Sequence, residues 1–264
     1  MLMISTRLVT IYRQWLNIVE VHSFLTRRFI AKAASINASL KTGICLDVGA
    51  GTAPYRQEIS KLFAVRRYIA VDFTPRGSLD VIADARALPI RDQSVDLVVC
   101  FEVLQHIAEY YTVLDEIRRV LRPRGSLIVS FPFIYGECGV VDFRRWTVAG
   151  MAQELERRGL VLVSSTRHGG VLYVITNILI WAVRHILPGS RATWRSPRTA
   201  VAYCREGLLA FLTFPLVLLS WVAIAVDRLL PEFGCYTGAL IFSQMSQTKD
   251  ECLRGGAVCQ LNGS

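Results

Sequence analysis

Apolar and polar positions between residues 44 and 165 alternate between short strand signals and helical periods. Val95–Phe101 is an apolar run typical of a strand buried on both faces of a parallel sheet. Apolar residues recur with a helical period over residues 107–121 and stop before Pro123, which cannot continue a helix. This alternation predicts a doubly wound, mostly parallel α/β sheet. The other expected strands are Ile44–Gly49, Arg67–Asp72, Val81–Asp84, Ser126–Phe131, Leu160–Ser165 and Thr237–Gln244, and the other expected helices are residues 54–63 and 147–158, the second capped by Thr147.

The alternation stops after Ser165, and two long apolar segments precede the strand that begins at Thr237. Residues 207–226 contain no charge, and a helix of this length is about 30 Å long, which matches the hydrocarbon core of a bilayer. Pro215 favours a kink in this helix. Residues 171–183 are too few for a full span and are more typical of an interfacial or re-entrant helix.

A single membrane crossing is excluded for this insert, because the strands on either side of it belong to one predicted sheet. Two crossings would put the arginine-rich stretch between the segments on the far side, against the positive-inside tendency. We therefore favour a monotopic hairpin with its arginines at lipid headgroups, on the cytoplasmic face of a membrane. The alternative is a lid packed on the core of a cytoplasmic protein.

The net charge of +9 is concentrated in two places. Basic residues dominate residues 1–41, and residues 184–205 hold five arginines and no acid. Such clusters bind nucleic acid, anionic lipid or an anionic substrate, or are simply solvated. Residues 1–40 are predicted to form a basic amphipathic helix, not a signal peptide, which either caps the core or lies on a membrane surface. The predicted organisation is this helix, an α/β domain (41–167 and 233–245), the apolar insert (168–232) and a flexible tail (246–264).

Cysteine usage indicates a reducing compartment. The seven cysteines are odd in number and show no CxxC spacing. Cys45 and Cys100 lie in apolar runs, where cysteine acts as a small hydrophobe. We therefore expect neither a disulfide framework nor a metal site.

The stretch Leu46–Thr52 predicts a ligand-binding turn, because Gly49 and Gly51 let the backbone turn tightly and approach a ligand. Such turns lie at the carboxyl ends of parallel strands, where open α/β sheets bind cofactors. Position 54 is proline, so the third glycine of the dinucleotide fingerprint is absent. Asp72, at the end of the second strand, suits both ribose hydroxyls of a nucleoside ligand, whether nicotinamide or adenosylmethionine.

Three later stretches distinguish between these ligands: DARALPIRDQSVDLV (84–98), EVLQH (102–106) and EIRRVLRPRG (116–125). Together with the glycine turn, they resemble class I S-adenosylmethionine-dependent methyltransferases of the ubiquinone/menaquinone-methyltransferase-like type. The resemblance covers about residues 44–165 and implies a Rossmann-like, seven-stranded sheet with S-adenosylmethionine as cofactor. The chain departs from the family pattern at Ala53 or Pro54, near the third glycine, at Gln105, and at Arg124, which replaces a glycine.

The resemblance also implies the cofactor contacts. Phe101 belongs to the implied pocket, although packing in the core is the alternative reading. The implied roles are Asp47, Gly49 and Gly51 at the methionine end, Asp72 at the ribose, Asp84 and Ala85 at the adenine, and Phe101 and Glu102 closing the pocket after the fourth strand.

Methyl transfer from a sulfonium mainly requires alignment of nucleophile, methyl and sulfur, and a hydroxyl nucleophile also requires proton removal. His106, just past the fourth strand, is the candidate base, and helix capping or a supporting hydrogen bond is the more favoured reading. Residues 142–147 resemble an element found in methyltransferases of bacterial surface-polysaccharide and glycolipid clusters. There, Asp142 would accept hydroxyl protons, Trp146 would stack on a sugar, and Tyr135, Arg144 and Arg145 would bind the acceptor. The equally favoured alternative is a salt-bridged cap on the helix that begins at Thr147.

These patterns together predict a membrane-associated methyltransferase for a hydroxyl of a lipid-linked sugar, glycolipid or polysaccharide precursor. The first alternative is a methyltransferase for a quinone-like or other lipidic small molecule. The second is a non-catalytic binding module that keeps the fold. A nucleic-acid substrate is less favoured, because no aromatic and basic platform is evident.

Overall fold

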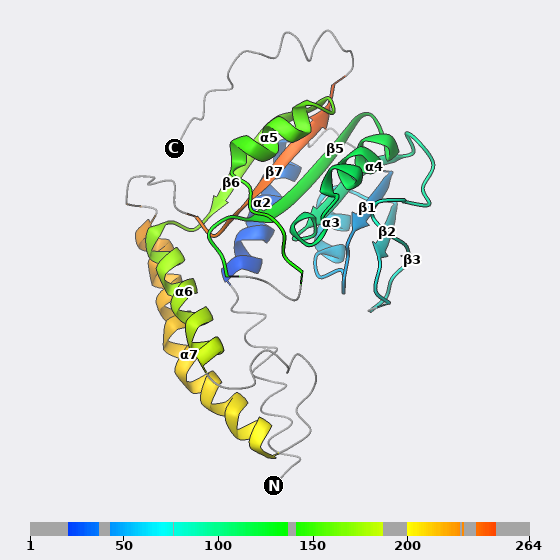
Figure 1. Cartoon of the computed structure of the whole chain (residues 1–264). Helices are drawn as coiled ribbons and strands as arrows, with labels where there is room; N and C mark the ends of the chain where they lie inside the picture. Colours follow the sequence, from blue (N-terminus) through cyan, green and yellow to red (C-terminus); the bar gives the residue numbers. More distant parts are fainter. Residues whose placement is uncertain are drawn as a thin grey trace. The chain divides into compact units, whose positions relative to one another are not determined.

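The computed structural model describes residues 21–36, 43–75, 77–136, 141–186, 200–227, 229 and 236–246 (Figure 1). The chain divides into two compact units. The first unit comprises Met1–Thr26, Ile134–Glu137 and Arg167–Gly238 and holds the apolar insert. The second comprises Arg27–Phe133, Cys138–Thr166 and Ala239–Ser264 and holds most of the sheet.

The sheet has seven strands in the order β3-β2-β1-β4-β5-β7-β6, which confirms the predicted Rossmann-like fold (Figure 1). β1 is parallel to β2 on one side and to β4 on the other, so the strand order reverses at β1. Ligands of doubly wound sheets bind at this reversal, outside the carboxyl ends of the strands. The strands are β1 (Ile44–Val48), β2 (Arg67–Asp72), β3 (Val81–Ile82), β4 (Val95–Phe101), β5 (Leu121–Pro132), β6 (Leu160–His168) and β7 (Gly238–Met245).

The helices of the sheet-bearing unit bury their apolar faces against the strands. In α2, Phe29, Ile30 and Ala33 are buried in one cluster with Ile59 of α3 and Leu240 of β7. This placement fits the core-capping reading for the described part of the predicted N-terminal helix, whereas residues 1–20 lie outside the described residues. The helices are α2 (Val21–Ile36), α3 (Arg56–Leu62), the short 3-10 helix η1 (Leu104–His106), α4 (Tyr110–Val120), α5 (Val148–Glu156), α6 (Val171–Ile186) and α7 (Ala200–Asp227).

β5 begins five positions earlier than the sequence pattern predicts. α4 ends at Val120, and Leu121 already pairs with Val95 of β4. The register then shifts, so that Leu97 pairs with Ser126. Within this irregular stretch Arg124 has a φ of +66°, the left-handed conformation that favours glycine.

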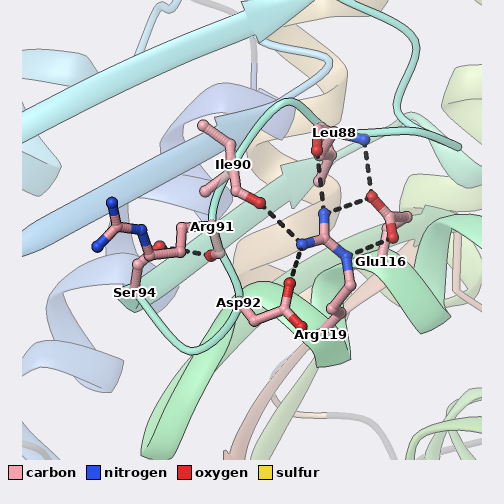
Figure 2. A network of polar contacts seen from close by, with 7 residues as sticks. All are labelled: Leu88, Ile90, Arg91, Asp92, Ser94, Glu116 and Arg119. Carbon is pink, nitrogen blue, oxygen red and sulfur yellow. Dashed lines mark hydrogen bonds and ion pairs between the residues drawn. The ribbon is translucent and has the colours of Figure 1, made fainter.

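A partly exposed arginine of α4, Arg119, connects this helix to the loop before β4 (Figure 2). Arg119 donates from Nε and Nη2 to the two carboxylate oxygens of Glu116 at 2.7 and 2.8 Å. It also donates to the carbonyl oxygens of Leu88 at 3.0 Å and Ile90 at 2.8 Å, and it pairs with Asp92. The Leu88 N–H donates to Glu116 at 2.7 Å. The network therefore fixes the loop between Asp84 and β4, because one planar guanidinium satisfies several acceptors at once.

α6 and α7 form a helical hairpin between β6 and β7 (Figure 1). The Asp227 carboxylate accepts hydrogen bonds from the N–H groups of Gly170, Leu172 and Tyr173 at 3.0, 3.1 and 2.9 Å, and so caps the N-terminus of α6. Among the described residues, no helix is both long enough and apolar enough to cross a membrane.

Replacing Arg124 with glycine should stabilise the protein. A left-handed conformation costs a non-glycine residue about 1 kcal/mol or more, and the flexibility that glycine adds to the unfolded chain offsets only part of this gain. We expect an increase of about 0.5–1 kcal/mol in the free energy of unfolding, measured in urea. Arg91→Gly is the control, because Arg91 is exposed and its φ is not positive. An equal gain in both variants, or none in Arg124→Gly, would contradict the strain at position 124.

Candidate functional site

The turn after β1 folds back onto the end of β2. The N–H groups of Gly49 and Ala50 both donate to the Val71 carbonyl, at 2.8 and 3.0 Å. Gly49 and Gly51 have φ values of +71° and +55°, which require glycine or strain. A Cβ on Gly49 would lie 2.3 Å from the Val103 side chain, so packing fixes this glycine. Apart from its chain neighbours, no described residue places an atom within 4 Å of a Cβ on Gly51, so the outer side of the turn has room for a ligand.

The turn contains one more left-handed residue. Ala53 has a φ of +50° and occupies the position of the third glycine of the family pattern. Its N–H donates to the Ala50 carbonyl at 2.7 Å. The turn therefore keeps the backbone path of a glycine-rich loop although the third glycine is missing.

Asp72 connects this turn to the loop after β2. Its Oδ2 accepts from the Gly51 N–H at 2.9 Å, and its Oδ1 accepts from the Thr74 N–H at 2.8 Å. Each carboxylate oxygen offers two acceptor sites, so both can also accept a ribose hydroxyl. The arrangement fits the predicted ribose contact, which needs a carboxylate held in one orientation.

Asp47 is a buried carboxylate, 4% exposed, at the end of β1. Burial raises its pKa to about 6, and the negative charge of Asp72 adds to this effect. The Tyr68 hydroxyl, which donates to Oδ2 at 2.6 Å, and the positive charge of Arg56 act in the opposite direction. Neither partner is predicted from the sequence pattern, and the one available signal for Tyr68 is an aromatic side chain with a polar hydroxyl beside the apolar run Ile69–Val71.

The predicted adenine residues lie on the loop after β3. Arg86 holds the Asp84 carboxylate with Nε 3.1 Å from both oxygens and Nη2 2.7 Å from Oδ2, and it lowers the pKa of Asp84. Arg86 also donates to Glu109 at 2.9 Å. Ala85 is partly buried beside this pair. The adenine contacts of Asp84 and Ala85 stay predictions, with Arg86 as an additional group that fixes the loop.

Phe101 and Glu102 end β4. Phe101 packs edge-on against Tyr55 with ring centroids 5.2 Å apart and borders the core, so it has at least the packing role. Glu102 has a φ of +56°, a conformation that is unusual for a residue other than glycine and that the surrounding contacts must hold in place. The Ser130 hydroxyl donates to Glu102 Oε1 at 2.7 Å, and Gln105 lies 3.4 Å from Oε2. Ser130 and Gln105 are therefore supporting residues that the sequence pattern did not identify.

His106 is oriented by a backbone carbonyl. Its Nδ1 lies 2.6 Å from the carbonyl oxygen of Val141. A carbonyl only accepts hydrogen bonds, so Nδ1 carries a proton, and Nε2, which lies 3.4 Å from the Gln105 side-chain nitrogen, is the acceptor nitrogen of that tautomer. The Phe143 N–H donates to the Gln105 carbonyl at 2.7 Å and holds the same segment against η1.

Residues 142–147 make contacts that correspond to the salt-bridged alternative. Asp142, whose side chain is 3% exposed, forms a bidentate ion pair with Arg145, and the Thr147 hydroxyl accepts from the Gly150 N–H at 3.0 Å to cap α5. Arg144 lies 4.7 Å from the centroid of the Tyr110 ring and donates to the Ala108 carbonyl.

Trp146 is placed in the core and not on an acceptor surface. It is 8% exposed and packs edge-on against Tyr110 and Phe131. This corrects the expectation that Trp146 offers a face for stacking on a sugar, because apolar residues flank the indole on strand β5 and helix α4. Tyr135 is half exposed and belongs to the insert-bearing unit. Its contact with an acceptor stays a prediction.

Comparisons with known proteins agree with this site. A family described as a methyltransferase domain matches residues 46–129, which include Asp47, both glycines, Asp72 and Asp84. The malonyl-[acyl-carrier protein] O-methyltransferase of Methylococcus capsulatus is 31% identical over 112 residues, which cover 38% of this chain and 40% of that protein. The chain spans half or less of the length of the curated relatives it matches.

Two solved structures share the fold. One, from Galdieria sulphuraria, is named as a sarcosine dimethylglycine methyltransferase; it is 14% identical, with a TM-score of 0.55 over 85% of this chain and 87% of that one. The other is the [4+2]-cyclase SpnF, 16% identical, with a TM-score of 0.52 over 84% of this chain and 82% of that one. The resemblance to class I S-adenosylmethionine-dependent methyltransferases is thus confirmed for residues 46–129. S-adenosylmethionine, the predicted cofactor, is the cofactor of that class.

Gly51→Ala should weaken cofactor binding without a matching loss of fold. Gly159 is the control, because it also has a positive φ, +74°, and open space where a Cβ would point, but it lies in the turn between α5 and β6. Both alanine variants should lose about 1 kcal/mol of stability from strain. Only Gly51→Ala should lose affinity for S-adenosylhomocysteine, by at least about tenfold in calorimetry, because its methyl group lies on the ligand side. Equal affinities in the two variants would place the cofactor elsewhere.

Proposed function

We propose that the protein is an S-adenosylmethionine-dependent methyltransferase that methylates an oxygen of a lipid-linked sugar, a glycolipid or a polysaccharide precursor at a membrane surface. The enzyme class rests on one observation: Asp47, the open glycine turn and Asp72 meet at the carboxyl ends of β1 and β2. The family match over residues 46–129 supports it.

The residues at this edge suit the three parts of the cofactor. Asp47 carries a negative charge for the amino-acid end, Asp72 has acceptors for the ribose hydroxyls, and the Asp84–Ala85 loop follows on the same edge of the sheet. The bound cofactor supplies a methyl group that is already activated by its sulfonium. The protein must therefore mainly align the acceptor, exclude water and, for a hydroxyl acceptor, remove a proton.

His106 supports an oxygen acceptor. A hydroxyl loses a proton during methylation, and the Nε2 lone pair of an imidazole protonated at Nδ1 can accept that proton. The Val141 carbonyl fixes this tautomer. The carrier-protein O-methyltransferase of Methylococcus capsulatus, by its name, also methylates oxygen. His106 is the last residue of η1, which follows the end of β4 by only a few residues.

The insert supports a lipidic acceptor. Several large apolar side chains on the described part of the hairpin are exposed, including Ile178, Leu219 and Val222. An exposed apolar area of this kind marks an interaction surface in a folded protein. The arginines at 184–205 suit anionic headgroups, since a polybasic stretch is attracted to anionic lipid.

Transfer of a radiolabelled methyl group to a total lipid extract tests the reaction. We expect a labelled product that is a glycolipid or lipid-linked sugar. His106→Ala should reduce the rate at least about tenfold, because general-base catalysis contributes more than this, while S-adenosylhomocysteine binding stays unchanged. An unchanged rate would exclude His106 as the base. A labelled quinone-like lipid would establish the alternative acceptor, and cofactor binding without any labelled product would favour the non-catalytic module.

Flotation with vesicles tests the membrane part of the proposal. The wild-type protein should float with vesicles that contain phosphatidylglycerol and less with vesicles of phosphatidylcholine alone. The double variant Leu219→Glu, Val222→Glu should lose most of this binding, because it places charges on the exposed face of α7. Val161→Glu with Val163→Glu is the matched control, since these two valines are also exposed but lie on β6. Equal flotation of the two double variants would contradict binding through the hairpin.

A further inference from the structure

Two residues that the proposed reaction does not use, Tyr68 and Arg56, act on the buried carboxylate of Asp47. The Tyr68 hydroxyl donates to Asp47 Oδ2 at 2.6 Å. Within the part of the chain that the structure describes, Tyr68 is the one hydrogen-bond partner of the Asp47 side chain. Asp47 therefore has acceptor capacity left, because an ionised carboxylate accepts up to about four hydrogen bonds.

Tyr68 is itself held in place from outside the pocket. The guanidinium of Arg56, on α3, lies 5.1 Å from the centroid of the Tyr68 ring, and its Nη2 donates to the Tyr68 carbonyl at 3.2 Å. Arg56 is in turn paired with Asp80, which accepts the Ala70 N–H at 2.8 Å. The chain of contacts runs from Asp80 through Arg56 and Tyr68 to Asp47, and it fixes the direction of the phenol hydroxyl.

We infer that Tyr68 is a positioning residue that keeps Asp47 ionised and oriented to bind the α-ammonium group of S-adenosylmethionine. The inference rests on the proposed function, because it needs the methionine end of the cofactor to lie at Asp47. The expected ligand group is a cation, because a nearby ammonium offsets the desolvation cost of a buried carboxylate that accepts a single hydrogen bond from the described residues.

The charge balance around Asp47 explains why this hydrogen bond matters. Burial and the charge of Asp72 favour the protonated carboxyl group, whereas Tyr68 and Arg56 favour the carboxylate, and the resulting pKa is about 6. The thiols of Cys45 on β1 and Cys100 on β4 are also near, but burial raises their pKa values well above 9, so they stay neutral. Removal of the phenol hydroxyl leaves Arg56 as the main group that opposes protonation. The pKa of Asp47 then rises above about 6, and near neutral pH the carboxyl group loses the charge that attracts an ammonium.

Calorimetry of S-adenosylhomocysteine binding between pH 5.5 and 7.5 tests this role with Tyr68→Phe. This pH range keeps the α-ammonium of the ligand protonated, because α-amino groups lose their proton at about pH 8. For the wild type, affinity should fall as the pH decreases through about 6, where Asp47 takes up a proton. In Tyr68→Phe this fall should begin at a higher pH, by about one unit, so that affinity at pH 6.5 is about threefold lower than in the wild type, the difference grows toward pH 5.5, and the two converge toward higher pH.

A second ligand separates positioning from a general loss of structure. Methylthioadenosine contains the adenosine part of the cofactor but has no α-ammonium. Tyr68→Phe should bind methylthioadenosine as tightly as the wild type does, whereas a deformed pocket would weaken both ligands. Equal weakening of both ligands at every pH would overturn the inference. Binding of neither ligand by the wild-type protein would instead contradict the proposed function.

Three further variants complete the test. Asp47→Asn should remove the pH dependence between 5.5 and 7.5, because the group that titrates is gone. Tyr111→Phe is the matched control; Tyr111 is exposed on α4, and its loss should change neither affinity nor pH profile. If Tyr68→Phe does not fold, Arg56→Gln replaces it, since this variant releases the ring and should move the pH profile in the same direction by a smaller amount. A pH profile of Arg56→Gln identical to that of the wild type would contradict the inference.

Discussion

The organisation of the site depends on the hydrogen bonds that fold the turn after β1 onto the end of β2. The Val71 carbonyl accepts two N–H groups of the turn, and the Asp72 carboxylate accepts a third from Gly51. Because these bonds run between neighbouring parallel strands, they place the ends of β1 and β2 side by side and leave the open side of Gly51 toward a ligand. Without these hydrogen bonds, Asp47 at the end of β1 and Asp72 at the end of β2 would not be held at one edge of the sheet, where doubly wound folds bind their ligands.

Three carboxylates on this edge share a residue type but have different properties. Asp47 is desolvated and holds its proton up to about pH 6. Asp72 accepts hydrogen bonds from backbone N–H groups, which fix the orientation of its carboxylate. Asp84 is paired with Arg86, which lowers the pKa of its carboxyl group. The surroundings therefore give the three carboxylates different properties: Asp47 titrates, Asp72 is a fixed hydrogen-bond acceptor, and Asp84 forms an ion pair that holds its loop. A [4+2]-cyclase has a similar fold, so the sheet alone does not determine the chemistry.

The sequence predicted most accurately those strands whose hydrophobic pattern follows directly from burial in the sheet. The bounds of β2 and β4 agree with the sequence pattern. For β4 the reason is burial within the parallel sheet, which produces an apolar run that ends where the strand ends. The start of β5 was missed, since a register shift leaves no trace in hydrophobicity. The role of Arg119 was also invisible in the sequence, because two of its acceptors are the backbone carbonyls of Leu88 and Ile90, which no side-chain pattern reveals. Trp146 was misplaced because an aromatic between charged residues has the same pattern on a surface and in a core.

The insert leaves the sheet and returns to it at nearly the same point. The Thr237 N–H donates to the His168 carbonyl at 3.1 Å, and Asp227 binds the backbone at Gly170. Lengthening a segment whose ends are joined costs little chain entropy, because the cost of closure grows only with the logarithm of the length, by about 0.6 kcal/mol for each doubling. The hairpin can therefore change in length, or be exchanged for another segment, without a change at the cofactor edge. One continuous stretch of the chain can thus vary in evolution while the sheet stays the same.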